Sequence, residues 1–267
     1  MSTEGAKDKE MDKTLLKGLM VLETIYKLDG KNLTIDEITE MVGLSRSNTH
    51  RTLQTLIHAG YVRRDPILNS YVCTLKMFEM GAQQVTRMDV RRYAPSFMRK
   101  LAQHTKETVH LSVLDGLDVV YIDKIDSPQP LIAYSTVGGR APAYAVATGK
   151  ALLAFQGPEY LDLFDFEKFE YPHAQKQLSL PAIKQEMTDI MRLGYAINRG
   201  EWRDSIGGVA APIFNGLGEP VAALGISGPL ERLTVQKMKE YTPFVLKIAQ
   251  KLSAHMGYSG ADSYATL

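Results

Sequence analysis

Residues 33–62 read LTIDEITEMVGLSRSNTHRTLQTLIHAGYV, and their pattern indicates the architecture of the first part of the chain. Its spacing predicts two short helices joined by a tight turn at a glycine. Thr34 and Glu37 form a capping box, in which the threonine hydroxyl and the glutamate carboxylate each accept a hydrogen bond from the other residue's N–H. Ser45 is a good N-cap for the second helix, which we expect over residues 46–59. Together these signals predict a helix-turn-helix.

The second helix has two faces of different chemistry. At about 100° per residue, Thr49, Leu53 and Leu56 share one narrow arc, which is expected to pack. A separate arc of about 140° carries basic and amide-bearing side chains, namely Arg46, Ser47, His50, Arg51 and Gln54. Between Leu44 and Arg64 there are four arginines, two histidines and no carboxylate. Because arginine can read guanine and glutamine can read adenine in the major groove, the face is suited to DNA.

Two short strands are expected directly after this helix, over residues 61–64 and 70–74. The loop between them, Asp65-Pro66-Ile67-Leu68-Asn69, is rich in turn-forming residues. A hairpin in this position is a wing. Arg63 and Arg64 at its base are placed to contact phosphate, which fixes register without reading sequence.

Length and composition set the class of protein. A chain of 267 residues is comfortable for two domains, and its net charge is +1. The single cysteine, Cys73, excludes an internal disulfide and a multi-cysteine metal site. The polar start of the chain lacks the apolar core of a signal peptide, and no apolar run approaches the ~18–20 residues of a membrane helix. We therefore expect a cytoplasmic protein that does not bind membranes.

Helices are expected on either side of the winged element. The first covers residues 13–28, with Leu15, Leu19 and Leu22 at helical spacing and Met20 and Ile25 widening the apolar stripe, and ends at Asp29-Gly30. Two more follow over residues 75–90 and 93–106, with a break near Pro95.

From residue 108 the pattern changes to strands mixed with helices. A hairpin with an Asp115-Gly116 turn is expected over residues 109–125. The further expected elements are strands at 130–136, 208–214 and 220–227, a loop at 138–142, and helices at 148–155, 179–193 and 234–256. This pattern predicts an α+β domain around an antiparallel sheet.

Three blocks of sequence in this order carry a family resemblance: IDEITEMVGLSRSNTHRTLQTLIHAGYVRRD, then ETVHLSVLDGLDVVYIDKIDS with TVGGRAPAYAVATGKALLAF, then RLGYAINRGEW with GGVAAPIFNGLGEPVAALGISGP. Over residues 12–257 the chain resembles the IclR family of bacterial transcriptional regulators. The resemblance implies an N-terminal winged helix-turn-helix and a C-terminal GAF-like antiparallel sheet with flanking helices. The domains are then a lead-in (1–12), the DNA-binding domain (13–76), a linker helix (77–92), an effector-binding and oligomerising domain (93–257) and a tail (258–267).

The resemblance also implies a function. A homodimer or homotetramer would bind a (pseudo)palindromic double-stranded DNA operator and regulate transcription of a catabolic operon, as a repressor, in response to a small organic acid. No cofactor, metal or catalytic residue is expected. The expected DNA-binding residues are Thr34, Ser45, Arg46, Ser47, Asn48, His50, Arg51, Gln54, Arg63 and Arg64.

The family's effector pocket maps onto Gly139, Arg140, Ala141, Tyr144, Ala145, Asn198, Gly208, Gly225 and Ser227. Several members carry Asp at position 198, Cys near 208 and Ser near 225. The loss of one carboxylate and two side chains predicts a larger, less negative pocket. We therefore expect an aromatic acid or related acyl derivative, with Trp202, Tyr144 and Tyr195 as an apolar wall.

Three alternatives accompany this interpretation. The pair Gly149-Lys150 suggests a phosphate-binding loop, but Tyr144 and Ala151 stand where that motif needs Gly and Ser or Thr, so Gly149 is assigned to close packing. An enzyme is disfavoured because no metal-ligand spacing and no nucleophile elbow occurs. A winged helix that makes only protein contacts would show no salt-dependent DNA binding.

The role of Arg140 also stays open: it either binds an anionic effector or is a surface charge.

Overall fold

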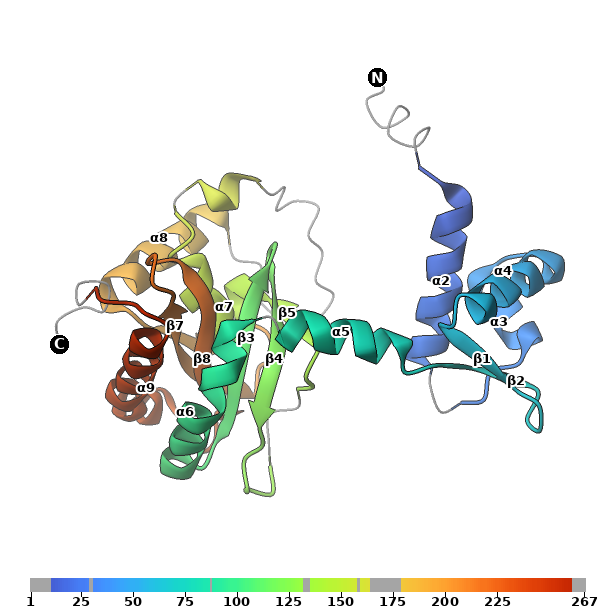
Figure 1. Ribbon diagram of the computed structural model, residues 1–267. Helices are drawn as coiled ribbons and strands as arrows, with labels where there is room; N and C mark the ends of the chain where they lie inside the picture. The colour runs from blue at the N-terminus through green and yellow to red at the C-terminus, as the bar shows by residue number, and fades with distance from the viewer. Residues whose placement is uncertain are drawn as a thin grey trace. The chain divides into compact units, whose positions relative to one another are not determined.

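The structure, a computed structural model, describes residues 11–28, 31–86, 88–131, 135–157, 159–163 and 179–260. Two compact units divide the chain, Met1–Gln84 and Val85–Leu267 (Figure 1). The expected helix end at Asp29-Gly30, most of the lead-in and most of the tail lie outside the described residues. Within the described part, no helix is both long enough and apolar enough to cross a membrane.

The first unit is a winged helix-turn-helix. Its elements are α2 (Lys13–Lys27), α3 (Ile35–Val42), α4 (Arg46–His58), β1 (Val62–Asp65), β2 (Ser70–Cys73) and α5 (Lys76–Thr86). Strands β1 and β2 form an antiparallel ribbon in which Val62 pairs with Cys73 and Asp65 with Ser70. The ribbon is tied back to the helices because the Tyr71 N–H donates to the Leu33 carbonyl at 2.8 Å. One core, built from every element but α5, includes Val21, Ile25, Leu33, Ile38, Val42, Leu53, Val62 and Tyr71.

Local hydrogen bonds set the ends of the two central helices. The Thr34 N–H donates to Glu37 Oε2 at 2.7 Å, and the Glu37 N–H donates to Thr34 Oγ1 at 3.4 Å, which completes the capping box. Gly43 adopts φ +64° at the turn, a conformation that glycine reaches without steric cost. Ser45 Oγ then accepts from the Asn48 N–H at 3.4 Å and starts α4.

The face that α2 buries agrees only in part with the expected apolar stripe. Ile25 of that stripe is buried, together with Val21, whereas Leu15 and Leu19 remain 62% and 48% exposed. Leu22 packs at the edge of the core. Helical spacing identified the apolar stripe but not the side on which α3 and α4 lie. An uncovered apolar strip, Leu15, Leu16, Leu19, Met20 and Tyr26, therefore runs along α2.

The second unit is an α+β domain, as the sequence predicts. Its six antiparallel strands lie in the order β5-β4-β3-β8-β7-β6. The strand bounds are β3 (Thr108–Asp115), β4 (Asp118–Ile125), β5 (Arg140–Pro142), β6 (Ala196–Arg199), β7 (Ile206–Phe214) and β8 (Pro220–Pro229). The helices are α6 (Asp89–Thr105), η1 (Ala143–Ala145), α7 (Ala147–Leu153), η2 (Tyr160–Leu163), α8 (Leu180–Leu193) and α9 (Val235–His255).

Each face of this sheet has its own core, because successive side chains of a strand point to opposite sides. Val209 and Ala211 of β7 pack with α6 and α9. Ala210, between them in sequence, packs instead with α7, α8 and η1. The second face is lined by small residues, and it is where the candidate pocket residues gather.

Three details of the second unit differ from expectation. Helix α6 continues through Pro95, because burial of Ala94, Phe97 and Met98 against the sheet outweighs the loss of one helical hydrogen bond. No described residue of 130–136 is in a strand, and 132–134 lie outside the described residues. Strand β5 forms instead from Arg140–Pro142, which was expected to be a loop and pairs with β4.

Candidate functional site

The first candidate site is the outer face of α4. Arg46, Ser47, His50, Arg51 and Gln54 are exposed, whereas Thr49 and Leu53 on the inner face are fully buried. The structure therefore keeps the packing arc and the polar arc apart, as the sequence indicates. Thr34 and Ser45 use their hydroxyls as helix caps, so their side chains position the helices.

Two arginines of this face have weak partners that DNA can replace. Arg46 Nη1 lies 3.0 Å from Asp36 Oδ1, with both side chains 67% exposed. Arg51 Nη2 donates to Asn48 Oδ1 at 3.0 Å, one turn earlier on the helix. Exposed contacts of this kind contribute at most about 1 kcal/mol, so exchanging them for phosphate or a base edge costs little.

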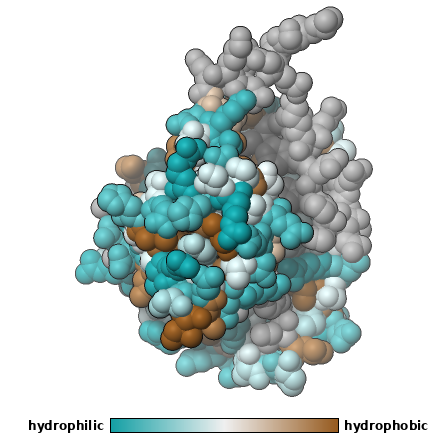
Figure 2. All heavy atoms as spheres, turned by 90° about the vertical axis from the view of Figure 1, so that its right-hand side faces the viewer, coloured by the Kyte–Doolittle hydropathy of each residue, from teal (hydrophilic) through white to brown (hydrophobic). Residues whose placement is uncertain are grey.

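The β-ribbon extends the same surface. Arg46, Ser47 and His50 line a shallow hollow with Arg64 and Asn69 of the ribbon. Arg64 donates to Asn69 Oδ1, so the ribbon holds its guanidinium in place. Arg63 precedes it in the strand and therefore points to the opposite face. Figure 2, viewed from the side of α4 and the ribbon in Figure 1, shows a mainly hydrophilic surface with small apolar groups.

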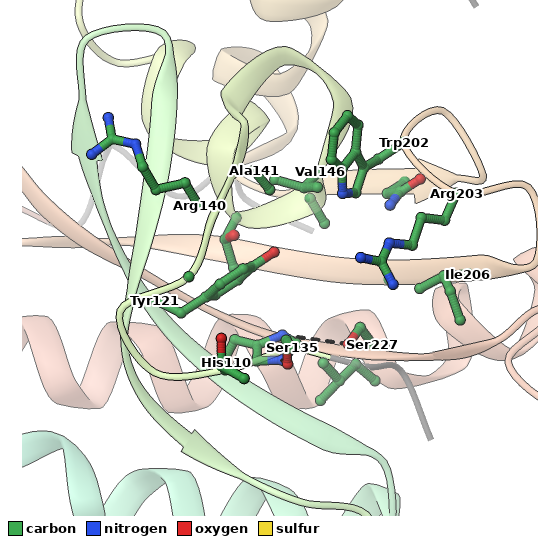
Figure 3. A pocket seen from close by; sticks show the side chains of 17 residues that line it. His110, Tyr121, Ser135, Arg140, Ala141, Val146, Trp202, Arg203, Ile206 and Ser227 are labelled. Carbon is green, nitrogen blue, oxygen red and sulfur yellow. Dashed lines mark hydrogen bonds between the residues drawn. The ribbon is translucent and has the colours of Figure 1, made fainter. Parts of the chain in front are cut away.

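The second candidate site is a cavity of about 140 Å³ in the second unit, on the sheet face that α7 covers (Figure 3). Its lining comes from the segment before β5, from β3, β4, β5, α7, β6, β7 and β8, and from the β6–β7 loop. The lining residues are His110, Tyr121, Ser135, Thr136, Gly139, Arg140, Ala141, Val146, Ala147, Thr148, Asn198, Trp202, Arg203, Ile206, Gly208, Ile226 and Ser227.

Cross-strand register explains why these residues meet. Ser227 of β8 pairs with Gly208 of β7, and Gly208 pairs with Asn198 of β6. Directly paired residues of antiparallel strands share one face, so these three form a row across the sheet. His110 of β3 lies next to this row and shares the face, and its ring nitrogen Nδ1 is 3.3 Å from Ser227 Oγ.

His110 is a neutral hydrogen-bonding group. Burial lowers its pKa to about 4, and the nearby Lys124 charge adds to the effect. Its Nε2 lies 2.7 Å from Ser135 Oγ, so the ring bridges two serines. The Tyr121 ring lies 4.7 Å away, and burial raises the pKa of its hydroxyl to about 12. At neutral pH the His110 ring and the Tyr121 hydroxyl are therefore both uncharged.

Asn198 shapes the β6–β7 loop. Its Oδ1 accepts from the Gly200 N–H at 2.8 Å and from the Glu201 N–H at 3.2 Å. An aspartate, which the family resemblance leads one to expect at this position, could accept the same bonds. Asparagine in place of aspartate therefore changes only the second terminal atom of the side chain, from an oxygen acceptor to the Nδ2 donor. This residue lines the cavity.

Arg140 does not point into the cavity. Its guanidinium lies 2.7 Å from Asp115 and 3.0 Å from Asp118. Partial burial opposes its charge, but the hydrogen bonds that it donates to both aspartates outweigh that cost and raise the pKa of Arg140. Figure 3 shows its side chain directed away, whereas the Arg203 guanidinium points among the other labelled side chains.

Three of the expected pocket residues lie outside the lining. Tyr144 and Ala145 are packed in the core beneath α7. A Cβ at Gly225 would lie 2.5 Å from Ala210 Cβ, so this glycine serves sheet packing and does not widen the cavity. Gly208 does line it, but a Cβ there would lie 2.6 Å from the Ile226 carbonyl. The expected aromatic wall reduces to Trp202, since Tyr195 is also absent from the lining.

A buried ion cluster connects α7 to the cavity loop. Lys150 is fully buried, and its Nζ lies 2.8 Å from Glu186 of α8 and 3.0 Å from Glu201. Gly149 next to it is packed so closely that a Cβ would lie 2.2 Å from the Ala143 carbonyl. The Gly-Lys pair is therefore structural, and not part of a phosphate-binding loop.

The structure brings in residues that the sequence argument missed, chiefly His110, Tyr121 and Arg203. Strand alternation together with the register of β3 against β8 would have placed His110, but that register cannot be read from one sequence. Among the described residues, no group of three or more His, Cys, Asp or Glu side chains is arranged to hold a metal ion.

Comparison with known proteins covers both units. Residues 14–66 match the IclR helix-turn-helix domain, and residues 82–254 match the bacterial transcriptional regulator IclR C-terminal domain. The HTH-type transcriptional regulator KdgR of Escherichia coli K12 is 34% identical over 94% of this chain and 96% of its own length. The regulator XynR of the same organism is 30% identical over 91% of this chain and 96% of its own length.

A solved structure gives the same result. The Thermotoga maritima IclR crystal structure matches with a TM-score of 0.75 and 32% identity, over 92% of this chain and 99% of that one. These relatives are transcriptional regulators and not enzymes. The protein therefore belongs to the IclR family of DNA-binding transcriptional regulators.

Proposed function

We propose that this regulator represses a catabolic operon. When a small organic acid occupies the cavity, the protein either dissociates from its operator or changes its arrangement on it. The observation that carries the proposal is the pairing of two sites in one chain. One is an exposed cationic helix face on which, among the described residues, only Asp36 forms an ion pair with an arginine. The other is a donor-lined cavity in a separate unit. Relatives named Transcriptional repressor IclR and Acetate operon repressor favour the repressing sign.

On DNA, α4 would lie in the major groove with Arg46, Arg51 and Gln54 toward base edges. Arg64 would hold phosphate from the ribbon, on the same side as the reading helix. A homodimer or homotetramer would set two such helices one DNA turn apart, ~34 Å, on a (pseudo)palindromic operator. The uncovered apolar strip of α2 supports self-association, because side chains such as Leu15 and Leu19 gain from burial against a second copy.

In the cavity, the ligand would be a small acid. A volume of about 140 Å³ is close to the ~150 Å³ that accommodates benzene in an engineered protein cavity. Trp202, Val146 and Ile206 offer an apolar wall, and the Ser227 hydroxyl, held by neutral His110, offers a hydrogen bond. We therefore keep the organic-acid class, including aromatic acids of about benzoate size, as the proposed effector.

The test uses a duplex recovered by in vitro selection with the full chain. Arg51→Ala is expected to weaken binding about 5- to 150-fold, since one good base or phosphate contact contributes about 1–3 kcal/mol. Arg99→Ala, an exposed arginine of the second unit, serves as the control and should bind normally. Unchanged affinity of the Arg51 variant in fluorescence anisotropy would show that α4 does not read DNA. Binding that ignores salt would favour a winged helix used for protein contacts.

A further inference from the structure

We propose that Arg203, together with the Tyr121 hydroxyl, binds the negatively charged group of the ligand and sets the preference for a monocarboxylate over neutral molecules. This inference rests on the proposed function of the cavity as a small-acid site. Arg203, and not Arg140, is then the residue that binds the anion.

The charges around the cavity support this assignment. Three other cations lie at or near it, and each already has carboxylate partners. Arg140 contacts Asp115 and Asp118. Lys124 lies 2.7 Å from Asp126, and Lys150 contacts Glu186 and Glu201.

Arg203 differs from these cations. In the part of the chain that the structure describes, no carboxylate lies within ion-pair distance of it. One cation of the lining is thus left to meet one ligand charge, which fits a monoanion better than a dianion. The charge of Arg203 is felt by the Tyr121 hydroxyl, where it opposes the effect of burial on the pKa.

The Arg203 side chain is exposed, but the backbone that carries it is fixed. The Arg203 carbonyl accepts from the Ile206 N–H at 2.9 Å, and the Ser205 carbonyl accepts from the Leu230 N–H at 2.8 Å. Asn198 holds the start of the loop through two hydrogen bonds, and Glu201 ties it to buried Lys150. A fixed loop lowers the entropy cost of placing the guanidinium against a ligand.

Tyr121 supplies the second donor. Its hydroxyl is protonated at neutral pH, and it forms no hydrogen bond with another described residue. In Figure 3 it points into the same space as the Arg203 guanidinium. A carboxylate has two oxygens, so it can accept from the guanidinium and from the phenol at once.

The experiment uses pairs of probes that differ in charge but hardly in shape, benzoate with benzamide and butyrate with butyramide. Trp202 is the only tryptophan of the chain and lines the cavity, so its emission reports occupancy directly. Calorimetry on the full chain provides a second readout that does not depend on fluorescence. The variants are Arg203→Gln and Arg203→Lys, with Arg140→Gln as a control that removes the same charge from the same lining.

In the wild type we expect each acid to bind at least tenfold more tightly than its amide. Arg203→Gln should weaken acid binding about tenfold and leave amide binding unchanged, because an exposed charge-assisted hydrogen bond lies at the lower end of its range. Arg203→Lys should retain part of the preference, and Arg140→Gln all of it.

The outcomes separate the two proposals. If the acids bind but Arg203→Gln leaves the acid-to-amide ratio unchanged, the role of Arg203 is refuted while the small-acid cavity stands. If neither acid perturbs Trp202 or gives heat with the wild type, the cavity is not a small-acid site and both proposals fail. If Arg140→Gln instead abolishes the difference between acid and amide affinity, Arg140 is the residue that binds the ligand's negative charge.

Discussion

Replacing Lys150 with methionine tests the buried ion cluster that holds the cavity loop. Methionine keeps most of the volume of the lysine stem but removes the charge that lies 2.8 Å from Glu186 and 3.0 Å from Glu201. The Glu201 side chain is only 12% exposed, so its carboxylate would remain buried without a counter-charge. Glu186 is 32% exposed and can turn to water.

The expected cost follows from these exposures. Breaking a buried ion pair by removing one partner costs roughly 3–5 kcal/mol. Because one of the two carboxylates can rehydrate, we expect the lower end, about 3 kcal/mol. For a unit of this size that corresponds to a fall in melting temperature of roughly 6–12 °C.

Thermal unfolding followed by circular dichroism and by Trp202 emission measures the effect. The control is Lys184→Met, which removes a lysine whose ion pair with Asp162 is exposed, so its cost should stay below about 1 kcal/mol. The double variant Lys150→Met, Glu201→Gln should recover part of the loss, since the uncompensated charge is then gone. Equal destabilisation by Lys150→Met and Lys184→Met, or a double variant no better than the single one, would refute this account of the cluster.

Three further predictions concern other parts of the molecule. Burial lowers the pKa of His110 to about 4, so below the ordinary histidine pKa of ~6.5 the unfolded state binds more protons than the folded state. The free energy of unfolding should therefore fall by up to ~3 kcal/mol between pH 6.5 and 4. His110→Gln should flatten this pH dependence when both proteins are unfolded with denaturant at a series of pH values. Arg64→Gln should reduce the slope of log K for DNA binding against log salt concentration by about 0.9, whereas Arg63→Gln, on the other face of the ribbon, should change it less. A larger effect of Arg63→Gln would show that the other face of the ribbon contacts phosphate. Leu19→Glu should leave the fold intact, since Leu19 is exposed, but shift the sedimentation coefficient to a smaller species, and an unchanged species would rule the α2 strip out of self-association.

Local signals in the sequence predicted the DNA-binding unit well. The Thr34–Glu37 box, the Gly43 turn and the Ser45 cap each depend on hydrogen bonds or dihedral angles within four residues. Such features form wherever the residues occur at that spacing. The polar arc of α4 was predictable for the same reason, because helical periodicity alone places its side chains on one face.

Features that depend on tertiary packing were less predictable. The spacing of α2 allowed two apolar faces, and only contact with α3 and α4 selects Val21 and Ile25 over Leu15 and Leu19. Pro95 was expected to break a helix that the sheet instead holds together. In both places burial overrides a local preference.

The cavity was predictable in location but only partly in composition. Family resemblance led to Gly139, Ala141, Asn198 and Ser227, which do line it. Arg140 lines it but turns to Asp115 and Asp118, and that capture depends on the β3–β4 turn meeting β5. His110 and Arg203 enter through cross-strand register and loop geometry, which a single sequence does not specify.

In the proposed function, occupancy of the cavity changes the affinity of the protein for DNA. The measurement is the Kd for the selected duplex, with and without a saturating concentration of the acid that most strongly changes Trp202 emission. We predict a change of at least about fivefold, the lower limit of typical coupling between sites, and the same factor in acid affinity when DNA is saturating. Arg203→Gln should bind the duplex normally without acid and need about tenfold more acid for the same change in Kd. A Kd for DNA that stays constant while the acid fills the cavity would contradict the claim.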